Sequence, residues 1–284
     1  MRRLPLPDSL VEQARSYADG SATPAEPRDA ATVVLLRPGS GTSGGPDVYL
    51  LRRQASMAFA GGMCVFPGGG VDPRDFDHAV TWAGPTPGQW AARLGTDEPM
   101  ARALVCAAVR ETFEESGVLL AGTADAVVAD TTGDGWEADR VALESRELSM
   151  TDFLERRGLV LRTDLLGAWS GWLTPAFEPR RYRTWFFVAA LPAGQVTRDV
   201  SSESSSVAWL PAADAVAQAE DGDLFMLPPT WLTCLDVAQH AGPAEVLAEA
   251  ADRSVEMFMP EVVADGEESV LSTPPRYAVL LAGR

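Results

Sequence analysis

The feature that most constrains this chain is a set of three glutamates on one predicted helix, downstream of a glycine-rich loop. Glu111, Glu114 and Glu115 stand at positions i, i+3 and i+4. On a helix they therefore share an arc of roughly 100°. Like charges at this spacing repel one another. A hard divalent cation such as Mg²⁺ prefers carboxylate oxygens and would neutralise them. The spacing predicts a metal-binding helix face or, as the simpler alternative, a solvated acidic face.

Three neighbouring features favour the metal-binding interpretation. Arg110 directly precedes the first glutamate and can pair with it. Gly117 follows the last glutamate by two residues and suits a left-handed helix end. The run 68–70 is all glycine, so the backbone there can approach an anion closely. Together these features predict a strand, a glycine-rich loop and a helix from about Glu98 to Ser116 that form one site.

The segment 110–118, Arg-Glu-Thr-Phe-Glu-Glu-Ser-Gly-Val, resembles the end of the Nudix box, which is written G-x5-E-x7-R-E-U-x-E-E-x-G-U with U apolar. Gly69 matches its opening glycine. Arg110 follows Gly69 by 41 residues, which implies an insertion relative to the pattern. Counted back from Arg110, the first glutamate of the box falls on Arg102, and Thr112 occupies an apolar position.

The interruption of the box is itself similar to one Nudix subgroup, that of the coenzyme A diphosphatases. The phrases Val65-Phe66-Pro67-Gly68-Gly69 and Leu227-Pro228-Pro229-Thr230 resemble that subgroup as well. The resemblance implies a Nudix α/β/α sandwich around a mixed sheet. We expect a single Nudix domain over residues 1–284, with a core of about 29–240, an insertion at 73–99 inside the box and a C-terminal extension of about 243–284.

The resemblance also implies a metal-dependent hydrolase of a nucleoside diphosphate that is linked to another group. Glu111, Glu114 and Glu115 would hold Mg²⁺ or Mn²⁺, and one of them would help to deprotonate the attacking water. The backbone carbonyl of Gly68 is the expected additional ligand, and Arg110 would orient the glutamates by charge pairing.

Many Nudix sites recruit a further acid from a later loop. The two candidates are Glu203, in a serine-rich loop, and Glu178, before the strongest predicted strand. We prefer Glu203 because loops between late strands often close over the site in this family. For each of them the alternative is an ordinary exposed glutamate.

The subgroup implies coenzyme A or an acyl-coenzyme A as substrate. Its 3′-phosphate would require arginines able to make forked contacts. Five arginines flank predicted strand ends and are the candidates: Arg52, Arg53, Arg180, Arg181 and Arg183. An ADP-ribose- or NADH-type diphosphatase is the alternative enzyme.

Two further alternatives come from other functional classes. A non-catalytic Nudix-fold binding or regulatory module is favoured by Arg102 at the glutamate position. A Nudix-fold isomerase of a prenyl diphosphate would need a reactive cysteine, for which Cys64 is the candidate, although its neighbours Val65 and Phe66 predict burial.

Composition limits the partners. The net charge is −17 and there is no lysine, which argues against broad nucleic-acid binding. No apolar run approaches the 18 or so residues of a membrane span, so we expect no membrane partner. The three cysteines have no zinc-like spacing and suit a reducing, cytoplasmic location. We therefore expect a small-molecule diphosphate as the partner, with a homodimer as an assembly to be tested.

The predicted insertion contains two tryptophans, Trp82 and Trp90, and little periodicity. A long irregular segment beside a site is often a lid or a binding loop. The alternative is that short helical pieces anchor the segment and that one tryptophan packs on the core. Thr96 is the predicted cap of the helix that follows.

Overall fold

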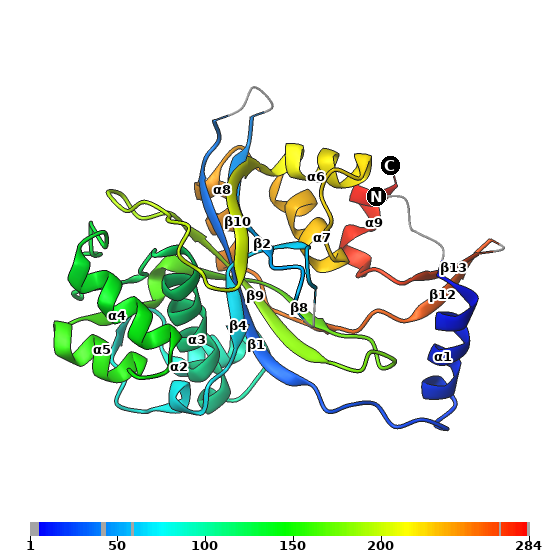
Figure 1. The fold of residues 1–284 in the computed structure, drawn as a ribbon, viewed down its shortest axis with the longest axis horizontal. Helices are drawn as coiled ribbons and strands as arrows, with labels where there is room; N and C mark the ends of the chain where they lie inside the picture. The colour runs from blue at the N-terminus through cyan, green and yellow to red at the C-terminus, as the bar shows by residue number, and fades with distance from the viewer. Residues whose placement is uncertain (1–5, 41–43, 58–59, 267, 283–284) are drawn as a thin grey trace.

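The computed structural model describes residues 6–40, 44–57, 60–266 and 268–282. Its centre is a mixed sheet of eight strands (Figure 1). In spatial order the strands are β10 (Ser204–Pro211), β2 (Pro46–Arg53), β1 (Arg28–Pro38), β9 (Tyr182–Ala190), β8 (Leu166–Leu173) and β11 (Met257–Phe258), with β3 (Cys64–Val65) beside β2 and β4 (Gly68–Gly70) beside β1. The central pair β1–β9 is parallel and β1–β2 is antiparallel.

Helices cover both faces of this sheet (Figure 1). One face is covered by α2 (Pro87–Leu94), α3 (Glu98–Ser116), α4 (Asp134–Glu144) and α5 (Met150–Arg157). The other face is covered by α6 (Ala212–Asp221), α7 (Pro228–Val237), α8 (Pro243–Ala251) and α9 (Ala278–Leu281). At the far end of the molecule α1 (Asp8–Ala18) lies beside the hairpin of β12 (Val262–Asp265) and β13 (Glu268–Leu271).

Short elements complete the described chain. A small sheet contains β5 (Trp82–Ala83), β7 (Val160–Arg162) and β6 (Ala121–Gly122). Three 3₁₀ turns lie at Pro73–Phe76, Thr163–Leu165 and Pro275–Tyr277. Within the described ranges, no helix combines the length and the apolarity needed to cross a bilayer.

Side chains of the central strands alternate between two cores. In β1, Val33 and Leu35 point to the core beneath α3, and Val34 and Leu36 point to the core beneath α7 and α8. Because both faces are covered, the strand reads as one continuous apolar run rather than an alternation of apolar and polar residues. The predicted α/β/α sandwich around a mixed sheet is confirmed.

The helix that carries the glutamates has the predicted bounds, but its cap differs. The prediction that Thr96 caps α3 is wrong by one residue. The Asp97 carboxylate accepts the Met100 N–H at 2.8 Å. Gly117 ends the helix in the left-handed region, with φ of +73°. The cap and the stop together fix which residues of α3 face the sheet.

The inserted segment is part of the core. Thr86 and Gln89 form a capping box that starts α2. The ring of Trp90 is fully buried, with its centroid 5.8 Å from that of Phe187. Trp82 is half-buried, with the guanidinium of Arg102 4.7 Å from its ring centroid. Both tryptophans therefore anchor the segment, and neither lines the cavity described below.

Candidate active site

The glycine-rich strand β4 brings the main chain against the carboxylates of α3. A Cβ atom on Gly69 would lie 2.5 Å from the Glu111 carboxyl group, and one on Gly68 would lie 2.5 Å from the carbonyl oxygen of Ala31. Real side chains do not tolerate such distances. The Gly68 N–H donates to Glu115 Oε2 at 2.8 Å. Glycine is therefore required at position 68 by the close approach of β4 to β1, whereas a side chain at position 69 would displace the Glu111 carboxyl group.

α3 directs Glu111 and Glu115 toward this strand and Glu114 toward Arg110, and each of the three is largely buried. Thr112 stands at an apolar position of the box, and its hydroxyl donates a hydrogen bond to the carbonyl oxygen of Ala108 at 2.7 Å. The hydroxyl is thus satisfied inside the helix, and Thr112 can pack like an apolar residue.

Asp75, a buried carboxylate that pairs with Arg110, is not among the residues that the sequence indicated. Its oxygens accept hydrogen bonds from Arg110 Nε at 3.1 Å and Nη2 at 3.0 Å. Asp75 lies six residues after Gly69, which is the spacing of the first glutamate in the box. The assignment of that position to Arg102 is wrong, because the extra residues follow Asp75. Counting forward from Gly69 gives Asp75, counting back from Arg110 gives Arg102, and the pairing with Arg110 selects Asp75.

Arg110 joins this aspartate to the glutamates. Its Nη1 atom donates to Glu111 at 2.8 Å and to both oxygens of Glu114 at 3.2 Å. Its Nη2 atom also donates to the carbonyl of Gly70 at 3.0 Å. The planar guanidinium holds its partners in a fixed geometry. It lies where it can orient two of the three glutamates.

The site has more buried carboxylates than positively charged groups to neutralise them. Three carboxylates, those of Asp75, Glu111 and Glu114, share the guanidinium of Arg110, and the buried carboxylate of Glu115 accepts only the Gly68 N–H among the hydrogen bonds of the described residues. Burial, followed by the charge of Glu111, raises the pKa of Glu114 to about 7. Burial also raises the pKa of Glu111 and, more strongly, that of Glu115. Buried carboxylates in this excess need a cation or protons.

The donor set fits a hard divalent cation. Across the described ranges, no three acidic, histidine or cysteine side chains are already gathered as they would be around a metal. Their hydrogen bonds explain this: Glu115 accepts from Gly68, whereas Glu111 and Glu114 face Arg110. The oxygens are of the type that Mg²⁺ and Mn²⁺ prefer, and their surplus charge has the matching sign. Side-chain rotation would be needed to bring them together.

A large cavity opens in front of the α3 glutamates, and both Glu203 and Glu178 line it. Glu203 lies on the loop before β10, and its Oε2 atom is 3.1 Å from Arg53 Nη2. Burial is the main cause of the raised pKa of Glu111 and of Glu115. The negative charge of Glu203 raises both pKa values further, as a smaller contribution. Glu178 lies in the loop between β8 and β9. Its neighbour Phe177 accepts a hydrogen bond from Gln13 of α1. The geometry brings Glu203, rather than Glu178, into the field of the α3 glutamates.

The five arginines predicted to bind substrate are separated by the fold. Arg53 and Arg180 line the cavity, and Arg52, Arg181 and Arg183 do not. Arg28, which the sequence did not single out, is also part of the lining.

Arg181 and Arg183 are engaged elsewhere. Arg181 is buried, and its guanidinium donates to the carbonyls of Thr174 and Ala25 at 3.1 and 3.0 Å. Arg183 is 3.2 Å from the Asp29 carboxylate. Their expected contact with substrate is therefore not supported, and Arg181 instead ties the N-terminal segment to the β8–β9 loop.

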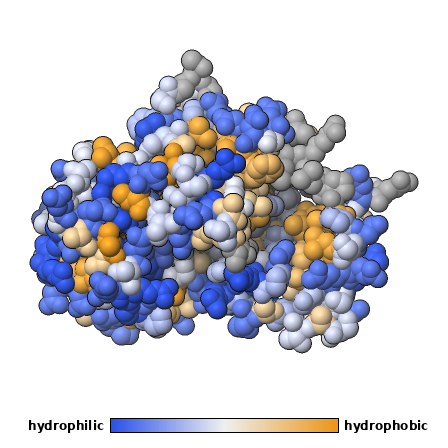
Figure 2. Space-filling model, viewed as in Figure 1, coloured by the Kyte–Doolittle hydropathy of each residue, from blue (hydrophilic) through white to orange (hydrophobic). Residues whose placement is uncertain are grey.

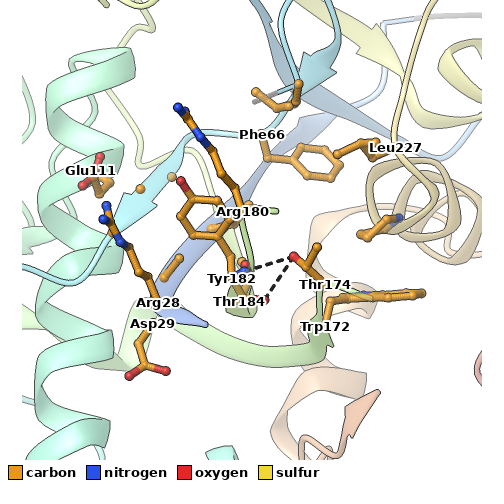
Figure 3. A pocket seen from close by; sticks show the side chains of 18 of the residues that line it. Arg28, Asp29, Phe66, Glu111, Trp172, Thr174, Arg180, Tyr182, Thr184 and Leu227 are labelled. Carbon is orange, nitrogen blue, oxygen red and sulfur yellow. Dashed lines mark hydrogen bonds between the residues drawn. The ribbon is translucent and has the colours of Figure 1, made fainter. Parts of the chain in front are cut away.

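A cavity of about 1410 Å³ opens in front of the glutamates. In Figure 3, Glu111 lies on one side, Phe66, Leu227 and Trp172 lie on the other, and Arg180 and Tyr182 lie between them. The surface is hollowed between the α3 side and the α1 side, where apolar residues gather (Figure 2). The cavity therefore joins an acidic wall to an apolar wall.

Leu227-Pro228-Pro229-Thr230, the second phrase shared with the coenzyme A subgroup, contributes to the apolar wall. An isolated parallel β-bridge, made by the backbones of Cys64 and Met226, places this segment beside the glycine-rich region. Cys64 itself is buried, and burial raises the pKa of its thiol. It does not provide the reactive cysteine that an isomerase would need.

Comparisons with known proteins agree with this geometry. The family model described as the NUDT19 Nudix domain matches residues 88–235. A putative Nudix hydrolase 7 of Caenorhabditis elegans is 29% identical over 187 residues, which cover 64% of this chain and 52% of that relative. The acyl-coenzyme A diphosphatase NUDT19 of Xenopus laevis is 24% identical over 266 residues, which cover 81% of this chain and 70% of that relative.

Among solved structures, a Nudix hydrolase from Alicyclobacillus acidocaldarius is similar over 82% of this chain and 99% of its own, with 25% identity and a TM-score of 0.67. The chain spans about half the length of the C. elegans relative that it matches. The family model covers more than half of this chain, from α2 through the glutamates to α7. The chain belongs to the Nudix family, in the group of the NUDT19 Nudix domain.

Proposed function

We propose that this protein is a Nudix diphosphatase, which hydrolyses the diphosphate of a nucleoside diphosphate derivative by attack of water on phosphorus. The observation that carries this proposal is the surplus of buried carboxylates against the glycine-rich strand, at the mouth of a large cavity. When bound, Mg²⁺ or Mn²⁺ would supply neutralisation of the diphosphate charge and a more acidic water.

The residues divide this work. Glu111, Glu114 and Glu115 would hold the cation with the Gly68 carbonyl, and Glu203 would supply the later acid. Arg110 would orient the glutamates through the hydrogen bonds described above. One of the three glutamates would accept a proton from the attacking water.

The substrate that we propose is coenzyme A or an acyl-coenzyme A. Relatives from two vertebrates, at 24% and 25% identity, are named acyl-coenzyme A diphosphatases. Arg28, Arg53 and Arg180 offer guanidinium groups for phosphate. The apolar wall suits the pantetheine arm and an acyl chain, which ADP-ribose and NADH lack. A cavity above the roughly 300–1,000 Å³ of common ligand sites also favours a long ligand.

A non-catalytic binding module remains the alternative of another class. The feature that favoured it was a missing acid in the box. With Asp75 beside Arg110, that acid has a replacement. The site therefore has the full set of charges that the box pattern requires, which supports an enzyme.

The test is hydrolysis of a panel with added Mg²⁺ or Mn²⁺: coenzyme A, an acyl-coenzyme A, dephospho-coenzyme A, ADP-ribose and NADH. We expect kcat/KM to be highest for the coenzyme A species and lower for dephospho-coenzyme A, which lacks the 3′-phosphate. A tenfold preference for ADP-ribose, about 1.4 kcal/mol, would overturn the substrate and leave the diphosphatase. Tight binding without turnover of any compound would favour the binding module.

We also infer a cytoplasmic location, because Cys64, Cys106 and Cys234 are free, buried thiols that suit a reducing compartment. Fractionation of cells that produce the protein would test this inference. The homodimer is a further prediction, to be tested by light scattering of the purified chain.

A further inference from the structure

We infer that Arg140 and Glu144 of α4 are positioning residues, which hold the loop that carries Glu203 in place over the carboxylates of α3. The inference rests on the proposed function, because it concerns the same site. Neither residue belongs to the Nudix box, and neither is among the candidates that the sequence suggested. The geometry assigns their role through three consecutive links.

The first link ties α4 to the helix that carries the glutamates. Arg140 is only 3% exposed, and its Nη1 atom donates to the carbonyl oxygen of Glu114 at 2.7 Å. This carbonyl lies in the last turn of α3, where backbone acceptors lack partners within the helix. Arg140 therefore fixes α4 to the turn that positions Glu114 and Glu115.

The second link joins α4 to the loop before β10. Glu144 Oε2 accepts from Arg140 Nη1 at 3.0 Å. Its other oxygen, Oε1, accepts from both the backbone N–H of Ser202 at 3.0 Å and the Ser202 hydroxyl at 2.6 Å. The backbone of the residue directly before Glu203 is thus held by a carboxylate that is itself held by Arg140.

The third link holds the loop from the opposite side. Gln54 Nε2 donates to the carbonyl of Ser202 at 2.7 Å, and the Gln54 N–H donates to that of Glu203 at 2.9 Å. Arg53 pairs with the Glu203 side chain. Residues 202 and 203 therefore lie between strand β2 and helix α4, and the loss of either side would free the Glu203 carboxylate to move.

Energetics favour a geometric role over a stabilising one. Arg140 also donates to Glu137 at 2.7 Å, and Glu137 is 2.5 Å from Arg198. Partly buried ion pairs cost desolvation and contribute little net stability compared with apolar packing. What such a network supplies is a fixed relation between elements. Here it relates the last turn of α3 to the segment 198–203.

A double-mutant cycle tests the inference through Mn²⁺ affinity, measured by the loss of the free-ion EPR signal. The variants are Glu144→Ala, Glu203→Ala and the double variant, with Glu155→Ala as the matched control, because Glu155 is an exposed glutamate on neighbouring α5. We expect Glu203→Ala and Glu144→Ala each to weaken Mn²⁺ binding about tenfold, and the double variant to be no weaker than Glu203→Ala alone.

Three further readouts separate positioning from folding. Glu144→Gln retains an acceptor for Ser202 and should bind Mn²⁺ within threefold of wild type. Glu144→Ala should lower kcat about tenfold and leave KM within twofold. Ser202→Ala removes one contact from the loop side and should weaken Mn²⁺ binding by about threefold, which keeps the test informative if Glu144→Ala does not fold.

Additive effects of Glu144→Ala and Glu203→Ala would overturn the positioning role, as would a Glu144→Ala variant that binds Mn²⁺ like the control. The wild type then still binds Mn²⁺ and turns over, so the proposed function stands. Absence of both Mn²⁺ binding and turnover in the wild type would instead overturn the proposed function, and the positioning role with it.

Discussion

Two ionic clusters, each with a buried carboxylate, lie on opposite faces of the central sheet, and they differ in charge balance. The glutamate cluster of α3 has Asp75, Glu111 and Glu114 around Arg110, with Glu115 held beside them by the Gly68 N–H. The C-terminal cluster beneath α7 and α8 has two acids and two arginines: Asp236, Glu249, Arg253 and Arg276.

Their surroundings differ as well. Arg253 lies over the ring of Trp169, 3.2 Å from its centroid, so an aromatic face covers the balanced cluster. The glutamate cluster instead faces the large cavity. Buried carboxylates are thus common to both clusters. The uncompensated negative charge and the open side distinguish the cluster that we propose as the cation site.

The largest effect is expected from breaking the balanced cluster. Asp236→Asn would leave Arg253 and Arg276 short of a carboxylate, and should lower the free energy of unfolding by about 3–5 kcal/mol. Urea denaturation measures this. Glu249→Gln, at a more exposed position, is the control and should cost less than about 1 kcal/mol. If Asp236→Asn were as stable as the control, the cluster would not hold the fold as described.

The next effect concerns catalysis. Glu115→Gln keeps an acceptor for the Gly68 N–H and removes one negative charge, so the fold should be retained. We expect kcat for diphosphate hydrolysis to fall about 100-fold or more, which is ~2.7 kcal/mol in activation free energy. Steady-state kinetics with added Mg²⁺ measure it. Activity within threefold of wild type would remove Glu115 from the proposed ligands.

A smaller effect should appear in the pH dependence of stability without metal. The folded pKa of Glu114 is about 7, above its ordinary value of 4.5. The folded state therefore retains a proton that the unfolded state releases. This contribution to stability is complete below about 4.5 and is lost as the pH rises through 7.

The expected difference between pH 5 and pH 8 is on the order of 1–3 kcal/mol. Unfolding in EDTA at both pH values measures it, with Glu114→Gln as the reference that lacks the titration. Mg²⁺ at pH 8 should restore stability to the wild type, because it binds the folded state. Parallel pH profiles for wild type and Glu114→Gln would contradict the raised pKa.

The smallest effect separates arginines of the cavity from arginines of the scaffold. Arg180→Ala should raise KM for the diphosphate about threefold to tenfold, roughly 1 kcal/mol of binding. Arg183→Ala is the matched control, because Arg183 pairs with Asp29 and lies outside the cavity lining. Equal effects of the two substitutions on KM would show that a place in the cavity lining does not distinguish Arg180 from Arg183 in substrate binding.

Local sequence signals predicted much of this molecule. The bounds of α3 follow from the spacing of its glutamates and from its terminal glycine, which act within a few residues, although its cap is Asp97 rather than the predicted Thr96. The three glutamates share a face because helix geometry requires it. None of these inferences depends on distant parts of the chain.

The sequence could not supply contacts made across the fold. Asp75 was missed because the extra residues make the box register ambiguous, and only the pairing with Arg110 resolves it. Arg181 looked like a ligand for phosphate because its partners, Ala25 and Thr174, are backbone carbonyls that no residue type reveals.

The pairing of Asp75 with Arg110 has a consequence for how this motif can be built. The two halves of the box are aligned by hydrogen bonds across space, and residues 77–79, just after the first half, are exposed. An unbroken backbone at that point is therefore not what sets the register. The chain could therefore be divided at residues 77–79 into two polypeptides, each of which carries one half of the box. Association of the two polypeptides would restore the site, and recovered turnover would measure that association.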